Sequence, residues 1–253
     1  MSVKNKVVVI TGGAEGIGFE IAKNYLQNEA KVVVLLDINE QKGSQAIEQL
    51  TSEYGKDRAC FFKCDITKDL EDVFNKVIHD FKTVHVLVNN AGTFNDALVT
   101  KTINVNVTAL IMWSLKFWEH MRKDKDGAGG TIINLASIYG YRVDQFVPVY
   151  QASKFAVMGF TKSLGHTYNY NRSGVKVVAI CPGFTETKLI ENPKTWEGGV
   201  SKDFLEFVKI QAWQNVDVVG KAAIEIYGKP SGSAWLIEGG LPIREIILDN
   251  RAI

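Results

Sequence analysis

The sequence is poor in cysteine, in histidine and in clustered charge, and each shortage excludes a class of protein. Its 253 residues include three cysteines, an odd and sparse count that argues against a disulfide framework and for a reducing compartment. Cys60 and Cys64 could supply two zinc ligands, but no second Cys/His pair lies at ligand spacing. We therefore expect no metal site and interpret both cysteines as small buried side chains in or beside a strand.

The four histidines are scattered, and none lies beside a carboxylate or a serine in a way that suggests a catalytic triad. A histidine-based hydrolase is therefore poorly supported. The formal net charge is +1 and no dense basic run occurs, so nucleic acid is not expected as the main partner.

Long apolar runs are also missing. No stretch approaches the roughly 18 residues that a membrane span requires. The N-terminal sequence MSVKNKVVVITGG has too short an apolar run for a signal peptide and lacks a small-residue cleavage site. We therefore expect a cytoplasmic protein with no membrane span.

What the sequence does contain is a regular alternation of short apolar runs and helical segments. Strands that are apolar throughout, separated by helices, predict a parallel sheet covered on both faces, which is a Rossmann-type doubly wound α/β fold. No linker, repeat or low-complexity stretch divides the chain, so residues 1–253 are expected to form a single dinucleotide-binding and catalytic domain. The seven predicted strands cover residues 6–10, 31–37, 59–66, 85–92, 130–137, 175–183 and 233–240.

A glycine-rich turn, TGGAEGIG, follows the first predicted strand. Glycine lets the backbone turn sharply and lets a pyrophosphate approach, and the helix that follows offers free N–H groups and a positive dipole end. Gly12, Gly16 and Gly18 give a TGxxxGxG spacing rather than GxGxxG. A turn required only for tight strand–helix packing is the alternative, but the position after the first strand favours cofactor binding.

Asp37 ends the second predicted strand, about twenty residues after this turn. A carboxylate at that place accepts hydrogen bonds from the adenosine ribose and repels a 2′-phosphate. Glu15 adds negative charge nearby, and no arginine follows Asp37. The sequence therefore favours NAD over NADP, although an Asp that merely ends a strand is the simpler alternative.

Two further strand ends carry polar or small residues. Asp65 and Ile66 end the third predicted strand, where an Asp can meet the adenine edge and an apolar neighbour can pack on the ring. Asn90, Ala91 and Gly92 end the fourth, where small and amide residues suit a loop that passes close to a cofactor. Both Asp and Asn also begin turns by bonding to their own backbone, so each motif alone has a purely structural explanation.

Tyr150 and Lys154 are four positions apart in VYQASKF, so on a helix they share one face. By itself such a pair is usually a weak, solvated contact. Ser137 ends the fifth predicted strand, and a serine there can converge with Tyr150 at the same mouth of the sheet.

In this order, TGGAEGIG, NNAG, Ser137, YQASK and CPGFTET resemble the motifs of the short-chain dehydrogenase/reductase family over nearly the whole chain. Within it, the chain is most similar to the group that holds the NAD-dependent 15-hydroxyprostaglandin dehydrogenases and the insect alcohol dehydrogenase-like proteins. The resemblance implies NAD as cofactor and a catalytic set of Asn106, Ser137, Tyr150 and Lys154. Asn104 is close to Asn106, which is chosen for its place in VNVTA.

The resemblance also implies a role for each member of this set. Tyr150 is the acid/base, Lys154 its cationic partner, Ser137 the group that orients the substrate oxygen, and Asn106 the holder of a proton-relay water. A free tyrosine has a pKa of about 10, and a nearby ammonium and the positive nicotinamide ring would both favour its phenolate. The implied cofactor contacts are Gly12, Glu15, Gly16, Ile17, Gly18, Asp37, Ile38, Asp65, Ile66, Asn90, Ala91, Gly92, Tyr150, Lys154, Pro182, Gly183, Phe184, Thr185 and Thr187.

The substrate side is expected to involve a lid of about residues 184–215. Its segment SKDFLEFVKIQAW has a broad apolar face, which either lines a pocket for a lipophilic alcohol or packs the lid onto the core. Phe146 and Val147 replace glutamines of the prostaglandin dehydrogenase pattern, which indicates a less polar substrate. The expected substrate contacts are Ser137, Tyr139, Gln145, Val147 and Tyr150.

These features favour an NAD-dependent oxidoreductase that acts on a secondary or lipophilic alcohol. The alternative is a non-catalytic NAD-binding or storage protein that retains the dehydrogenase fold. The family usually pairs through its long helices, so a homodimer or homotetramer is expected, with residues 109–121 and 155–168 as candidate surfaces. The C-terminal segment REIILDNRAI could add to such a contact.

Overall fold

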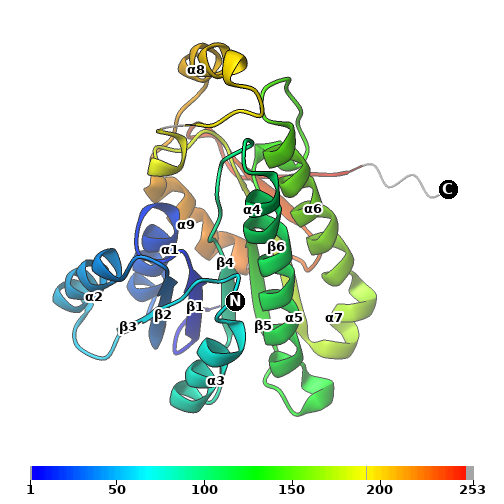
Figure 1. Cartoon of the computed structure of the whole chain (residues 1–253). Coiled ribbons are helices and arrows are strands. Elements are labelled where there is room, and N and C mark those ends of the chain that lie inside the picture. The colour runs from blue at the N-terminus through cyan, green and yellow to red at the C-terminus, as the bar shows by residue number, and fades with distance from the viewer. Residues whose placement is uncertain (1, 192, 249–253) are drawn as a thin grey trace.

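The computed structural model describes residues 2–191 and 193–248, whose eight strands form one sheet in the order β3-β2-β1-β4-β5-β6-β7-β8 (Figure 1). Strands β1 to β7 are parallel, and β8 pairs antiparallel with β7. The expected doubly wound α/β fold is confirmed. The strands are β1 (Val7–Thr11), β2 (Val32–Asp37), β3 (Ala59–Lys63), β4 (Val86–Asn89), β5 (Gly130–Leu135), β6 (Val175–Pro182), β7 (Ala234–Ile237) and β8 (Arg244–Glu245).

The apolar strands are buried on both faces of the sheet, which explains why their sequences do not alternate. The helices are α1 (Gly16–Gln27), α2 (Glu40–Tyr54), α3 (Leu70–Phe81), α4 (Val99–Ile103), α5 (Leu110–Met121), α6 (Pro148–Leu164), α7 (Thr167–Ser173), α8 (Ser201–Lys209) and α9 (Val216–Tyr227). In β1, Val8 and Ile10 belong to a core cluster with α1, α2 and α9, whereas Val7 and Val9 belong to a second cluster with α3 and α5.

The eighth strand was not expected from the sequence. Arg244 and Glu245 are exposed and polar, so no apolar run marks them as a strand. They extend the sheet because they pair with Leu236 and Trp235 of β7. Residues 249–253 of the C-terminal segment lie outside the described residues.

The helix that begins at Pro148 is shorter than the sequence suggests. The sequence VYQASKFAVMGFTKSLGHTYN predicts one long helix from Val149 to Asn169, but α6 ends at Leu164 and α7 begins at Thr167. A Cβ at Gly165 would lie 2.5 Å from the backbone nitrogen of Gly232, so the chain at this point packs directly against another backbone. The Nδ1 atom of His166 then accepts the N–H of Tyr168 and starts α7.

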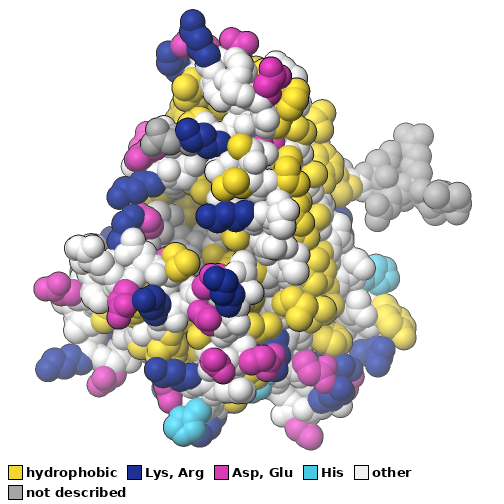
Figure 2. Space-filling view, viewed as in Figure 1, with side chains coloured by type: hydrophobic (Ala, Val, Ile, Leu, Met, Phe, Trp, Pro, Cys, Tyr) yellow, Lys and Arg dark blue, Asp and Glu magenta, His cyan; other side chains and the backbone are white. Residues whose placement is uncertain are grey.

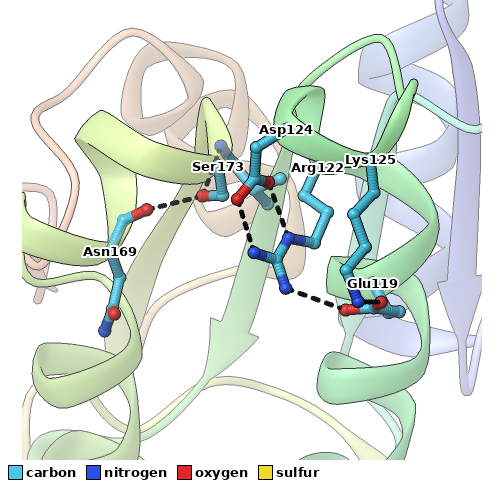
Figure 3. Close-up of polar contacts among 7 residues, drawn as sticks. Glu119, Arg122, Asp124, Lys125, Asn169 and Ser173 are labelled. Carbon is cyan, nitrogen blue, oxygen red and sulfur yellow. Dashed lines mark hydrogen bonds and ion pairs between the residues drawn. The ribbon is translucent and has the colours of Figure 1, made fainter.

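A polar network closes the C-terminal end of α5, before β5 and β6 begin (Figure 3). The Arg122 guanidinium donates to Glu119 Oε2 at 3.1 Å and to both oxygens of Asp124, at 2.7 and 2.5 Å. The Ser173 hydroxyl donates to the backbone oxygen of Asn169 at 2.7 Å. Surface ion pairs add little stability, so this network mainly orders the turns at the end of the sheet opposite the site described below.

Hydrophobic side chains gather on the surface over α5 and α6 (Figure 2). Met112 and Leu115 of α5 and Phe155 of α6 are each more than 40% exposed. Within the described ranges, no helix is both long enough and apolar enough to cross a lipid bilayer.

Candidate active site

A cleft of about 1810 Å³ opens where the parallel strands end. It is lined by Asp37 at the end of β2, by Asn90 after β4, by Ser137 after β5 and by Pro182 at the end of β6. The chain leaves β1 toward β2 and β3 on one side and later returns to β4 on the other, and ligands of open α/β sheets bind at such a reversal. Helix α8 stands beyond these strand ends, at the top of Figure 1.

The glycine-rich turn between β1 and α1 has a backbone that no other residue type could follow. Gly12 has φ +62°, and a Cβ on it would lie 2.8 Å from the Cα of Ala91. A Cβ at Gly18 would lie 2.2 Å from the carbonyl oxygen of Gly12. On one side the turn packs tightly against Ala91 and against the first turn of α1. On the other side it exposes backbone N–H groups at the start of a helix, which is the arrangement that accepts a pyrophosphate.

Asp37 is braced against this turn. Its Oδ2 accepts the N–H of Ala14 at 3.2 Å and its Oδ1 accepts the N–H of Asn39 at 3.0 Å. Glu15 pairs with Lys42 on α2 and lies 3.7 Å from the ammonium of Lys188. The carboxylate of Asp37 is thus fixed at the edge of the cleft.

Asn90 ties the glycine turn to the end of β4. Its side-chain amide donates to the carbonyl oxygens of Thr11, at 3.0 Å, and Gly12, at 2.8 Å. The Thr11 hydroxyl in return accepts the N–H groups of Asn90 and Ala91. The NNAG motif therefore sets the shape of the cleft floor rather than extending a free amide into it.

Asp65 and Ile66 line the other end of the cleft. Hydrogen bonds from the side chain and the backbone of Thr67 hold Asp65 in place, and the side-chain bond is the main reason why the pKa of Asp65 lies below its ordinary value. Every residue expected to contact the cofactor lines the cleft except Gly18, which supports the turn from behind.

Ser137, Tyr150 and Lys154 meet at the opposite end. The Lys154 Nζ donates to the carbonyl oxygen of Leu135 at 2.8 Å and lies 5.5 Å from the centre of the Tyr150 ring. The Ser137 side chain lies close enough to the Tyr150 phenol to lower its pKa, against the effect of burial. All three side chains are less than 10% exposed and line the cleft, so the helix-face pair and the strand-end serine are brought together as the sequence predicted.

Burial acts on both members of the Tyr–Lys pair. It raises the pKa of Tyr150, the Ser137 side chain opposes this, and the charge of Asp96 adds to the increase. Burial also lowers the pKa of Lys154 to about 8. Burial therefore disfavours the charged form of each group, and a phenolate at Tyr150 needs a positive charge close by.

Asn106 lies beneath the cleft rather than on its wall. Its side-chain oxygen accepts the N–H of Thr93 at 2.8 Å, and its amide donates to the Thr93 carbonyl and to the Ser153 hydroxyl. It belongs to a π-helical turn, Asn104–Ala109, between α4 and α5, a feature that often marks functional sites. Asn104, which the sequence left as the alternative, lines the cleft instead.

Two expected substrate contacts lie elsewhere. Gln145 is exposed and Val147 is fully buried in the core, and neither lines the cleft. The loop before α6 turns Val147, the residue just before the helix, into the hydrophobic core. Tyr139 does line the cleft. Thr185 lines it too, but its hydroxyl already donates to Gly183 and accepts from Gln214.

An aromatic wall next to Tyr150 was not found from the sequence as a unit. The ring of Phe94 lies 4.6 Å from that of Tyr150, centre to centre, and 5.7 Å from that of Phe204 on α8. Phe184 and Trp213 extend this wall, and the centres of their two rings lie 5.6 Å apart. Phe94 follows NNAG directly, but only the fold shows that its ring meets the segment 184–215.

Comparison with known proteins shows which family the sequence matches. The family model described as short chain dehydrogenase matches residues 6–198. The 15-hydroxyprostaglandin dehydrogenase (NAD(+)) of Homo sapiens is 38% identical over 194 residues, which cover 76% of this chain and 73% of that protein. Alcohol dehydrogenase 1 of Ceratitis cosyra is 35% identical over 223 residues, 87% of this chain and 86% of that one.

A solved structure is similar over almost the entire chain. The 3-ketoacyl-(acyl-carrier-protein) reductase from Brucella melitensis, complexed with NADH, has a TM-score of 0.79 and 25% sequence identity. The similarity covers 94% of this chain and 99% of that one. Together with the NAD(+) in the name of the human relative, this supports a nicotinamide cofactor.

The contact behind the glycine turn yields a first test. Gly18→Ala should weaken NADH binding by about tenfold or more, because overpacking costs about 1–3 kcal/mol and the new methyl group would push the Gly12 carbonyl out of place. NADH fluorescence titration measures this. Gly228→Ala is the control, since its Cβ meets its nearest atom at 3.4 Å. Unchanged NADH affinity in Gly18→Ala would contradict the assignment of the turn.

Proposed function

The chain belongs to the short-chain dehydrogenase family, and from that premise we propose that it is an NAD-dependent oxidoreductase that interconverts a secondary or lipophilic alcohol and its carbonyl compound. The observation that carries the proposal is the meeting of Ser137, Tyr150 and Lys154 in one cleft with a bare glycine turn and a fixed Asp37.

Each side chain at the reacting end has a defined task. Tyr150 removes the hydroxyl proton in oxidation and returns it in reduction. Ser137 hydrogen-bonds the substrate oxygen and holds it beside the phenol. Lys154, held by the Leu135 carbonyl, compensates the charge of the phenolate and would bind ribose hydroxyls of the cofactor. A nicotinamide bound in the cleft supplies the acceptor or donor of the hydride.

Asn106 is proposed as the fourth member of this set. Its side chain joins the Thr93 backbone to Ser153 on α6, three residues after Tyr150. It therefore keeps the floor of the cleft in contact with the catalytic helix.

Asp37 is the basis for NAD rather than NADP. Its two oxygens are held by backbone N–H groups, whereas the carboxylate of Glu15 is already paired with the ammonium of Lys42. A 2′-phosphate would meet the negative charge of Asp37, whereas ribose hydroxyls would donate to it. The name of the human relative specifies NAD(+), in agreement with this preference.

The segment 184–215 is proposed as the lid over the substrate. Phe184, Phe204 and Trp213 line the cleft beside Tyr139 and Phe94, and their rings form an apolar wall. An apolar or aromatic substituent on the carbinol carbon suits such walls. Residue 192 of the lid lies outside the described part of the chain.

We further propose a cytoplasmic homo-oligomer. The apolar side chains over α5 and α6 (Figure 2) form a surface that two copies could bury against each other. The whole of residues 1–253 would act as one catalytic domain.

The proposal is tested by turnover. The protein should reduce NAD⁺, and NADP⁺ far less well, with at least one member of a panel that runs from short secondary alcohols to isoprenoid, steroid and hydroxy fatty acid alcohols. Tyr150→Phe should lose at least about 100-fold in kcat, the lower range for general acid/base catalysis, while it retains NADH binding. Absorbance of the reduced cofactor reports the rate.

Tyr141→Phe is the matched control, because Tyr141 is a neighbouring tyrosine that does not line the cleft. Activity that survives in Tyr150→Phe would refute the assigned mechanism. Tight NADH binding by the wild type without turnover of any alcohol or carbonyl compound would instead favour a non-catalytic NAD-binding protein.

The pH dependence follows from the proton that Tyr150 must accept. Burial raises the pKa of the Tyr150 phenol, so its phenolate is scarce at low pH. The kcat/KM for oxidation should therefore rise as the pH increases and the NAD⁺-loaded site loses this proton. Reduction should show the opposite trend. An oxidation rate that stays constant from about pH 6 to about pH 10 would contradict this account.

A further inference from the structure

The start of α6 is closed by a carboxylate from a distant part of the chain. Asp96 follows β4, yet its Oδ1 accepts the N–H of Tyr150 at 2.9 Å and its Oδ2 accepts the N–H of Val149 at 2.7 Å. The residue at the helix N-cap, Val147, has no side chain that could do so. Asp96 therefore provides, from 54 positions away, the hydrogen bonds that a local N-cap aspartate would provide.

Asp96 also holds the segment proposed as the lid. Its own N–H donates to the carbonyl oxygen of Lys194 at 2.8 Å, and Asn95 forms a parallel bridge with Lys194. The Thr102 hydroxyl of α4 donates to the carbonyl oxygen of Asn95 at 2.6 Å. The dipeptide Asn95–Asp96 thus joins α4, the lid segment and the catalytic helix at one buried point, since Asp96 is only 1% exposed.

Groups from several elements face the Tyr150 phenol and set its charge. Lys154 lies on the same helix, Ser137 comes from the end of β5, and Tyr139 of the following turn packs edge-on at 6.1 Å. Phe204 of α8 approaches through Phe94 and brings no charge. Asp96 contributes the negative charge, which raises the pKa of Tyr150, whereas the Ser137 side chain lowers it.

Two further groups act on these neighbours rather than on the phenol. Cys181 of β6 is the second influence on the pKa of Lys154, after burial, and raises it. Asp144, in the loop before α6, raises the pKa of Asp96, although burial raises it more.

We propose that Asp96 is a positioning residue that fixes Tyr150 through the backbone at the start of α6 and ties it to the lid segment at Lys194. The proposal rests on the proposed function, in which Tyr150 is the acid/base. Asp96 does not line the cleft, and it acts through the two N–H groups from which it accepts hydrogen bonds and through its charge. That charge favours the protonated phenol and so opposes the effect of Lys154.

An ordinary helix cap would change stability alone, whereas a positioning residue changes the chemistry of Tyr150. Asp96→Asn keeps the size of the side chain and one carbonyl oxygen but removes the charge. Asp96→Ala removes both acceptors. Asp144→Asn is the matched control, because Asp144 is a carboxylate near the same helix end whose Oδ1 binds the Gln151 side chain instead of a Tyr150 N–H.

The measurements are the pH profile of alcohol oxidation, kcat and KM separately, NADH affinity and the melting temperature. Asp96→Asn should retain kcat within about threefold at its optimum and shift the rising limb of the profile by about one unit to lower pH, because it removes a charge that raises the pKa of Tyr150. Asp96→Ala should lose about tenfold or more in kcat with NADH affinity unchanged, because the phenol is no longer held. Asp144→Asn should leave the profile in place.

A wild-type profile in Asp96→Asn, an equal shift in Asp144→Asn, or wild-type kcat in Asp96→Ala would each overturn the proposal. If Asp96→Ala does not fold, the pH profile of Asp96→Asn alone tests the proposal. A melting temperature that falls in both Asp96 variants without any change in pH profile or kcat would leave Asp96 as a structural cap and also overturn it.

A second measurement separates this proposal from the proposed function. The ¹³Cζ signal of Tyr150, assigned by its loss in Tyr150→Phe, is titrated in the NAD⁺-loaded protein by NMR. It should move at lower pH in Asp96→Asn than in the wild type, whether or not any alcohol is oxidised. Identical titrations overturn the role of Asp96, whereas a shifted titration without turnover by the wild type would overturn only the proposed function.

Discussion

The burial of Tyr150 beside Lys154 is the constraint on which the rest of the site depends. Low exposure makes a charge on either group costly, so the pKa of the phenol is raised and that of the ammonium is lowered to about 8. A phenolate next to an ammonium relieves both costs at once. The phenolate that alcohol oxidation requires is therefore favoured only while a positive charge, the Lys154 ammonium or the nicotinamide ring of NAD⁺, lies beside it.

Holding the side chains of Tyr150 and Lys154 at a fixed distance from each other requires rigid support from the surrounding elements. The buried amides of Asn89 and Asn134 form a chain with Ser114 and Thr161 that joins β4 and β5 to α5 and α6. The Leu135 carbonyl fixes the ammonium of Lys154 from the end of β5. Fully satisfied polar networks of this kind specify one arrangement of a core, and this one sets α6 relative to the strand ends.

The parts of the structure that depend on local pattern could be predicted from the sequence. Seven strands follow from apolar runs, and the cleft follows from motifs at successive strand ends that must meet at one edge of a parallel sheet. Contacts between distant segments could not be predicted. Nothing next to Asp96 shows that it binds α6, and the direction of the loop before that helix, which removes Gln145 and Val147 from the cleft, depends on tertiary packing.

The central claim, that the pair loses a proton when the positive nicotinamide ring enters the site, can be measured without knowing the alcohol. Isothermal titration calorimetry with NAD⁺ is performed near neutral pH in two buffers of different protonation enthalpy. The difference between the two binding enthalpies gives the number of protons released. The account predicts release by the wild type and none by Tyr150→Phe. No release by the wild type, or equal release by both proteins, would contradict it.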